Sequence, residues 1–237
     1  MKKTAVLAVL ALFLLCGFSS GEEAKDILKR VREKDSNIGN VFKTFRMVYN
    51  KKSPWGFNGT FETLIKADKK RMNSNSGTLT SDAIFDGVNC WNIFPMTGTT
   101  QQNKDYYDQN DKGLFAWVKK FNDNVKITGE ETVDKRKCWI IEGDGGEEYL
   151  KKIWVDEKAL SLIKAEGGSM KLVNSEFKAL NDDYEVPMKT DILRDDKTDM
   201  AIVVTVLETG KDLSDDLFKV DVKPNNNPFG GLIQFGK

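Results

Sequence analysis

The chain has no histidine among its 237 residues. This absence excludes Ser-His-Asp and Cys-His catalysis and removes the commonest protein ligand of transition metals. The sequence also has no P-loop and no Gly-x-Ser-x-Gly motif. Residues 143–146, GDGG, resemble the start of a calcium loop, but the acidic positions that such a loop needs do not follow. We therefore expect no enzymatic activity, no metal site and no cofactor.

An excess of charge of either sign is also lacking, because 36 Lys and Arg balance 36 Asp and Glu. No net field therefore favours nucleic acid as a partner. A hydrophobic content of 40% and a charged content of 30% are typical of a soluble globular protein. The length is compatible with one large domain, which is the organisation we expect.

The N-terminal residues 1–21 have the pattern of a secretory signal peptide. Two lysines precede an apolar run at 4–15, and small residues follow it. The apolar run is too short to span a bilayer comfortably. We expect a mature chain that begins near Ser20 or Glu22 and is soluble in the periplasm.

A lipid-anchored protein is the alternative interpretation of the same segment. In that case Cys16 would be the acylated first residue of the mature chain. A small residue is expected before such a cysteine, and Leu15 stands there instead. The anchored form is therefore the less favoured alternative.

Residues 22–34 have the periodicity of an amphipathic helix. Ala24, Ile27, Leu28 and Val31 recur at helical spacing, with charged residues on the other face. A second short helix is predicted over 111–122, where apolar and aromatic residues gather. It is either a packing helix or a lid over an apolar cavity, since exposed aromatic surface marks binding sites.

The remainder of the chain consists of short strand patterns. Asp86-Gly87 predicts a type I′ hairpin between strands at 78–85 and 88–94. Residues 97–110 are polar and are a loop or an edge strand. Further strands are expected at 41–50, 59–73, 126–131, 136–141, 150–156, 160–165, 171–180, 188–194 and 200–208. Many short strands with few helices predict a mainly β (α+β) chain with one antiparallel sheet, curved or nearly closed.

Several of these strands are apolar on both faces, including CWII, IWV and AIVVTVL. An ordinary antiparallel strand has one wet face, so this pattern favours a sheet wrapped around something apolar. Cys90 and Cys138 lie in two such strands, each directly before a tryptophan. They are either joined in a disulfide or are two small buried hydrophobes.

The order of these segments resembles the outer-membrane lipoprotein carrier and sorting family, the Lol carrier superfamily. The similar stretches are VFKTFRMVY, GTFETLIKADKKRM, IFDGVNCWNIFP, KCWIIEG, KKIWVDEKALSLIKAEG, YEVPMKTDILRDD and IVVTVLETGKDLSDDLFKV. Residues 224–237, which begin with PNNNP and continue into a Gly-rich end, are expected to be a tail. The resemblance implies a strongly curved antiparallel sheet that forms a half-open barrel capped by helices over 22–223. It also implies that Arg71 stands at the family's basic position, although no proline precedes it here.

The resemblance implies a periplasmic carrier that holds an acyl chain of a lipoprotein, or another lipid, in an apolar concavity. An inner-membrane donor complex and an outer-membrane acceptor would be its partners, and we expect a monomer. The alternative is an envelope stress sensor or protein-interaction module with the same fold. The predicted lining residues are Phe45, Phe61, Ile65, Trp91, Ile93, Phe115 and Trp117, with Arg71 at the rim to meet an anionic headgroup. A register error of one residue would exchange the faces on which they lie.

Overall fold

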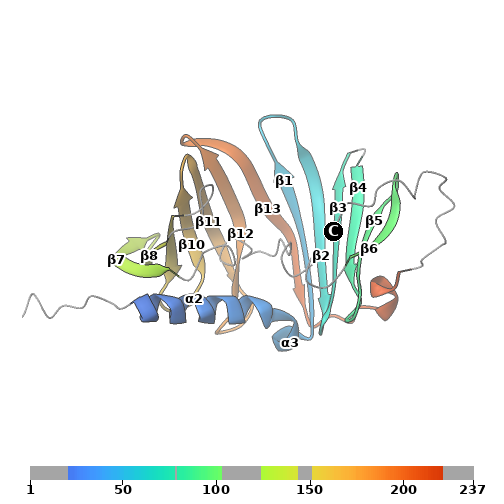
Figure 1. Ribbon diagram of the computed structural model, residues 1–237, viewed down its shortest axis with the longest axis horizontal. Helices are drawn as coiled ribbons and strands as arrows, with labels where there is room; N and C mark the ends of the chain where they lie inside the picture. Colours follow the sequence, from blue (N-terminus) through green and yellow to red (C-terminus); the bar gives the residue numbers. More distant parts are fainter. Residues whose placement is uncertain (1–20, 78, 103–123, 144–150, 221–237) are drawn as a thin grey trace, which may run out of the picture.

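The computed structural model describes residues 21–77, 79–102, 124–143 and 151–220 (Figure 1). The predicted signal peptide, the predicted helix at 111–122 and the predicted tail lie outside these ranges. Within them, no helix is long and apolar enough to cross a membrane.

The described residues form one 13-stranded antiparallel sheet with the order β6-β5-β4-β3-β2-β1-β13-β12-β11-β10-β9-β8-β7. The chain runs outward from β1 to β6 and returns from β7 to β13, so that β1 pairs with β13 in the middle (Figure 1). The strands are β1 Thr44–Lys52, β2 Asn58–Lys66, β3 Lys69–Ser76, β4 Leu79–Phe85, β5 Cys90–Phe94, β6 Gly98–Gln102, β7 Val125–Val133, β8 Arg136–Gly143, β9 Lys152–Asp156, β10 Leu162–Gly167, β11 Met170–Ala179, β12 Glu185–Arg194 and β13 Lys197–Thr209. This curved, open sheet confirms the predicted fold class.

Helix α2, Gly21–Ser36, lies along the half of the sheet that contains β7 to β12 (Figure 1). Its predicted apolar positions are buried against side chains of β7 to β12, among them Ile141, Ile153 and Leu172. Burial of this face stabilises the helix, because an isolated helix of this length is marginal in water. We call the side of the sheet that carries α2 the helix face.

Helix α3, Ile38–Phe42, follows at once and packs on the same face at the centre of the sheet. Ile38 and Phe42 contact a cluster that contains Phe45 and Met47 of β1 and Val204 of β13. The predicted strand at 41–50 therefore begins later, at Thr44. Because β1 pairs with β2 on one side and with β13 on the other, this cluster lies where the N-terminal and C-terminal halves of the sheet meet.

The side of the sheet away from α2, here called the opposite face, has apolar clusters of its own. The 3-10 helix η1, Asp215–Phe218, packs Phe218 against Leu64 of β2. A second cluster joins Cys138, Trp154 and Ile163 of β8 to β10. The two-sided strands β8 to β10 are thus explained by cores on both faces of the sheet. The apolar run of β13 is not, because Val203 is 41% exposed.

Two local predictions were wrong. Residues 59–73 are not one strand: they form most of a hairpin, in which Lys66 of β2 pairs with Lys69 of β3 and Ala67 has a φ of 52°. At Asp86-Gly87, only Gly87 has a positive φ, whereas a type I′ turn needs two such residues. The Asp86 carboxylate instead accepts the backbone N–H groups of Val88 and Asn89 at 2.8 and 2.7 Å, as in an Asx turn.

Candidate functional site

An apolar strip crosses the helix face where β1, β2 and β13 meet. Directly paired residues of antiparallel strands share a face, so the pairs Phe45–Ile65 and Tyr49–Phe61 place four side chains together. Ile65 and Tyr49 pack against the central cluster around Met47 and Val204. The strip therefore continues the core beyond the part of the sheet that α2 covers.

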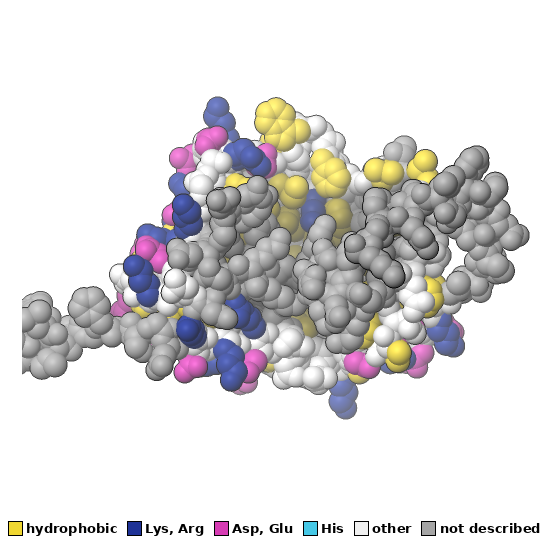
Figure 2. Space-filling view, viewed as in Figure 1, with side chains coloured by type: hydrophobic (Ala, Val, Ile, Leu, Met, Phe, Trp, Pro, Cys, Tyr) yellow, Lys and Arg dark blue, Asp and Glu magenta, His cyan; other side chains and the backbone are white. Residues whose placement is uncertain are grey.

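The end of this strip nearest the β1–β2 turn is aromatic. Tyr49 and Phe61 stack with their ring centroids 5.3 Å apart, and Phe57 lies 6.4 Å from Phe61. Lys51 holds its Nζ 4.5 Å from the centroid of the Phe61 ring. Burial raises the pKa of the Tyr49 hydroxyl. Figure 2 shows hydrophobic side chains gathered at the upper centre of the molecule, over β1 and β2. This end combines apolar surface with a cation held against it.

The structure brings together Phe45, Phe61 and Ile65 of the predicted lining residues. It places Arg71 and Trp91 on the opposite face, because both pair with Ile84 in register. Ile93 lies two residues after Trp91 on β5, and residues two apart in a strand point to the same face, so Ile93 also lies on the opposite face. Phe115 and Trp117 lie outside the described residues. The predicted lining is thus divided between two sides of the sheet.

Arg71 is engaged in an ion pair with Asp82 of β4. Its Nε and Nη2 donate to the two carboxylate oxygens of Asp82 at 3.0 and 2.9 Å, and its Nη1 donates to the Leu217 carbonyl at 3.3 Å. The hydrogen bonds to Asp82 raise the pKa of the guanidinium. Arg71 therefore holds the C-terminal segment against β3 and does not face the apolar strip.

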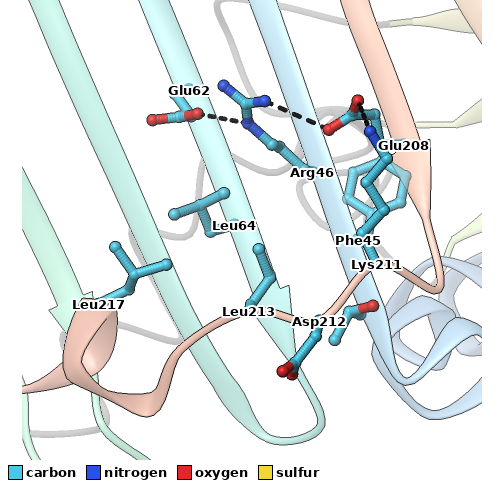
Figure 3. Close-up of a pocket in the computed structure, with 10 residues that line it drawn as sticks. Phe45, Arg46, Glu62, Leu64, Glu208, Lys211, Asp212, Leu213 and Leu217 are labelled. Carbon is cyan, nitrogen blue, oxygen red and sulfur yellow. Dashed lines mark hydrogen bonds and ion pairs between the residues drawn. The ribbon is translucent and has the colours of Figure 1, made fainter.

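A cavity of about 430 Å³ lies on the opposite face, beside the segment that leads into η1 (Figure 3). Arg46 bridges two carboxylates there, with Nε 2.8 Å from Glu62 and Nη1 3.2 Å from Glu208. Leu64, Leu213 and Leu217 supply the apolar part of its wall. Hydrogen bonds to both glutamates raise the pKa of Arg46, so its guanidinium remains charged. We interpret these three side chains as a structural brace across β2, β1 and β13.

This cavity was not predicted from the sequence, because its residues come from segments more than 140 positions apart in the chain. The signal that could have found it is the alternation along β1 and β2. Arg46 follows Phe45 directly and Glu62 follows Phe61 directly, so each charged side chain points to the face opposite its aromatic neighbour. That alternation separates two faces but does not indicate which strand lies next to β1.

A second cleft of about 550 Å³ lies near the β7–β8 turn and is lined mainly by charged residues. Arg136 donates to both carboxylate oxygens of Glu185 at 2.6 and 3.1 Å. Its guanidinium also lies 4.3 Å from the centroid of the Phe177 ring. These contacts join β8, β11 and β12, so we interpret this cleft as a structural ion cluster.

Cys90 and Cys138 are both buried and are not joined in a disulfide, so the disulfide alternative was wrong. Cys90 lies on β5 and Cys138 on β8, each one strand from a different edge of the sheet. Burial raises the pKa of the Cys138 thiol to about 11. Both residues therefore belong to the packing of the sheet.

Three solved structures share this fold over most of their length. A domain named for outer-membrane lipoprotein sorting from Vibrio parahaemolyticus matches with a TM-score of 0.57 and 10% identity, covering 84% of this chain and 97% of its own. A DUF1329 family protein from Desulfovibrio piger matches with a TM-score of 0.56 and 15% identity, covering 84% and 96%. A LolA superfamily protein from Nitrosomonas europaea gives 0.51 and 13%, covering 82% and 98%.

These similarities show that the chain shares the fold of these three structures. At such low identity the likeness concerns the fold alone, as the absence of any matching family model or curated protein sequence underlines. The resemblance inferred from the order of the sequence segments is confirmed at the level of the fold.

Proposed function

We propose that this protein is a periplasmic carrier that binds an acyl chain of a lipoprotein, or of another amphiphile, on the helix face. The observation that carries this proposal is the aromatic end of the apolar strip, where Phe57, Phe61 and Tyr49 follow one another at centroid distances of 6.4 and 5.3 Å. A row of rings on a curved sheet suits a long apolar chain. The Lol-like fold, shared with a domain named for lipoprotein sorting, supports the same function.

Binding would be driven by removal of apolar surface from water. Each buried methylene contributes about 0.8 kcal/mol, so an acyl chain needs no specific hydrogen bond for useful affinity. Lys51, whose Nζ lies against the Phe61 ring, takes the place of Arg71 as a cation beside the strip. In this function the chain would receive its cargo from an inner-membrane donor and deliver it to an outer-membrane acceptor, and it would act by binding rather than by catalysis.

The test is titration of the purified protein with a fluorescent fatty acid, together with extraction of co-purified lipid. Phe61→Glu places a charge in the strip, and Phe57→Glu does so at its half-exposed end, where folding is least affected. Ile93→Glu is the matched control, because Ile93 lies on the opposite face. We expect saturable binding by wild type and Ile93→Glu, and a loss of roughly tenfold or more for the two phenylalanine variants.

Folding of each variant is checked by circular dichroism. If wild type shows no saturable binding and carries no extractable lipid, the carrier function fails. A protein-interaction module with the same fold then takes its place. Equal affinity of Ile93→Glu and the two phenylalanine variants would show that the ligand does not use the helix face.

A further inference from the structure

Exposed apolar side chains gather at one end of the N-terminal half of the sheet. In an antiparallel meander, alternate turns lie at the same end, so the β1–β2, β3–β4 and β5–β6 turns are neighbours (Figure 1). Trp55 is 85% exposed, Leu79 63% and Met96 81%, one from each hairpin. Phe57 and Phe94 are also exposed beside the first and third turns. We call these five residues the apolar rim.

The apolar rim has a distinct charge pattern. Residues 51–58, 75–80 and 94–98, which form its three turns, contain Lys51 and Lys52 but no aspartate or glutamate. The turns at the other end of these strands contain Asp68 and Asp86. Apolar tips whose own turns carry cations and no acidic residue are compatible with lipid phosphates, which would repel acidic turns.

Trp55 is positioned at the rim by the neighbouring β13. Its indole Nε1 donates to the Asp199 carboxylate at 3.1 Å. Asp199 also lies 3.7 Å from the Arg194 guanidinium, which compensates its charge. The polar atom of the indole is therefore satisfied within the protein while most of the ring is exposed. Tryptophan with one satisfied polar atom and an apolar ring is typical of membrane interfaces.

The shape of the rim favours a bilayer over a protein groove as the partner. Neighbouring strands are about 4.8 Å apart, so successive turns at the same end lie roughly 10 Å apart. The exposed side chains therefore project separately from the three turns at this end of the strands. A deformable lipid surface can accommodate all of them at once.

We propose that the apolar rim docks this protein on a phospholipid bilayer, with the tips of three hairpins inserted among the headgroups. The proposal deepens the carrier function and rests on it in one respect: Phe57 belongs to both the rim and the aromatic strip, so an acyl chain leaving the bilayer would meet Phe57 and then Phe61. In this arrangement the acyl chain would enter the apolar strip from the rim.

The experiment is co-sedimentation with vesicles of phosphatidylcholine and phosphatidylglycerol. It uses processed protein from the periplasm, with its N-terminus established by mass spectrometry, because an acyl group on Cys16 would bind vesicles by itself. Trp55→Glu and Met96→Glu are compared with Val88→Glu. Val88 is the matched control, since it is 75% exposed on the β4–β5 turn at the other end of the same sheet. Each rim variant is expected to lower the partition coefficient roughly tenfold, and Val88→Glu to leave it unchanged.

Docking is separated from cargo binding by titrating the same variants with fluorescent fatty acid in the absence of vesicles. The rim variants are expected to bind it like wild type, because the rings that form the aromatic end of the strip are those of Tyr49, Phe61 and Phe57. The proposal is overturned if wild type does not bind vesicles, or if the rim variants and Val88→Glu bind them equally well. Those results would leave the carrier function standing, whereas vesicle binding without fatty-acid binding would refute the carrier function alone.

Discussion

Ile65 and Arg71 occupy facing strands of one hairpin, yet their side chains lie on different faces of the sheet. Ile65 pairs with Lys70, and Arg71 pairs with Leu64. Ile65 therefore joins the cluster under α3, whereas Arg71 reaches Asp82 and the Leu217 carbonyl on the opposite face. A difference of one residue in register separates a position beside the apolar strip from one that supports the C-terminal segment.

Loss of the Arg71 guanidinium is expected to reduce stability without affecting ligand affinity. Arg71→Met leaves Asp82, whose side chain is 19% exposed, without its bidentate partner and should cost about 1–3 kcal/mol. Urea denaturation measures the change, and fatty-acid titration provides the second readout. Arg71→Lys keeps the charge but loses the bidentate geometry, so an intermediate stability is expected. Weakened fatty-acid binding at unchanged stability would instead return Arg71 to the ligand site.

The packing of α2 is expected to contribute strongly to stability. Leu28 is buried between the helix and the sheet, so Leu28→Ala should lower the free energy of unfolding by about 2–4 kcal/mol. Lys29→Ala is the control, because the Lys29 side chain is mostly exposed and lies 3.9 Å from Glu33. Its expected effect is below about 0.5 kcal/mol. Equal midpoints of thermal unfolding for the two variants would show that α2 is not docked in solution.

Trp154 tests the core on the opposite face. Its Nε1 donates to Glu131 at 2.7 Å, and Lys164 lies 4.2 Å from its ring centroid. Trp154→Ala should destabilise the protein by about 3–5 kcal/mol, since the side chain is buried. The exposed Thr132→Ala on β7 is the control. Chemical denaturation measures the difference. A free energy of unfolding for Trp154→Ala close to that of Thr132→Ala would show that Trp154 is not part of a packed core.

The buried cysteines lead to a prediction about pH. The pKa of Cys138 is raised to about 11, above the value of 9.0 for an unperturbed thiol, so the folded state favours the neutral form. Its contribution to stability is complete below pH 9 and is lost as the pH rises toward 11. Wild type should therefore lose more stability over this range than Cys138→Ala.

Reductant should not change the midpoint of unfolding of the wild-type protein, and a decrease of that midpoint on adding reductant would indicate a disulfide after all.

The N-terminus provides a direct chemical test. We expect the secreted chain to begin near Ser20 or Glu22, just before or within the start of α2. Intact mass spectrometry of protein recovered from the periplasm measures this. Detection of a diacylglyceryl group on Cys16 would establish the anchored form and contradict the soluble one.

Much of the architecture was predictable from local pattern. The helical spacing of Ala24, Ile27, Leu28 and Val31 identified the buried face of α2 before any partner was known. The strands at 126–131 and 136–141 were also predicted, and the turn that joins them, at Asp134 and Lys135, has φ values of 47° and 67°. Periodicity carries such information because each residue's direction follows from its position in a single element. The wrong prediction at 59–73 arose because alternation continues across a tight turn without a strong breaker.

The composition of the site was less accessible to sequence analysis. Phe45, Phe61 and Ile65 lie together on the helix face, whereas Arg71, Trp91 and Ile93, which were assigned to the same lining, lie across the sheet from them. The apolar runs in β8 to β10 were interpreted as evidence of a cavity, but Cys138, Trp154 and Ile163 form a second core. Both errors have the same origin, because sequence alternation separates two faces without saying what covers each.

The sequence by itself determined that the chain is a mainly β protein with an amphipathic helix near its N-terminus, since helical and strand periodicities are properties of single segments. Tertiary structure decided which strands became neighbours, above all the pairing of β1 with β13 across more than 140 residues. It also decided that the exposed Trp55, Leu79 and Met96 lie at the same end of neighbouring hairpins. Hydrogen bonds between strands set their register, and a one-residue shift would move every side chain of a strand to the other face. The faces, and with them the site, are therefore a property of the assembled sheet.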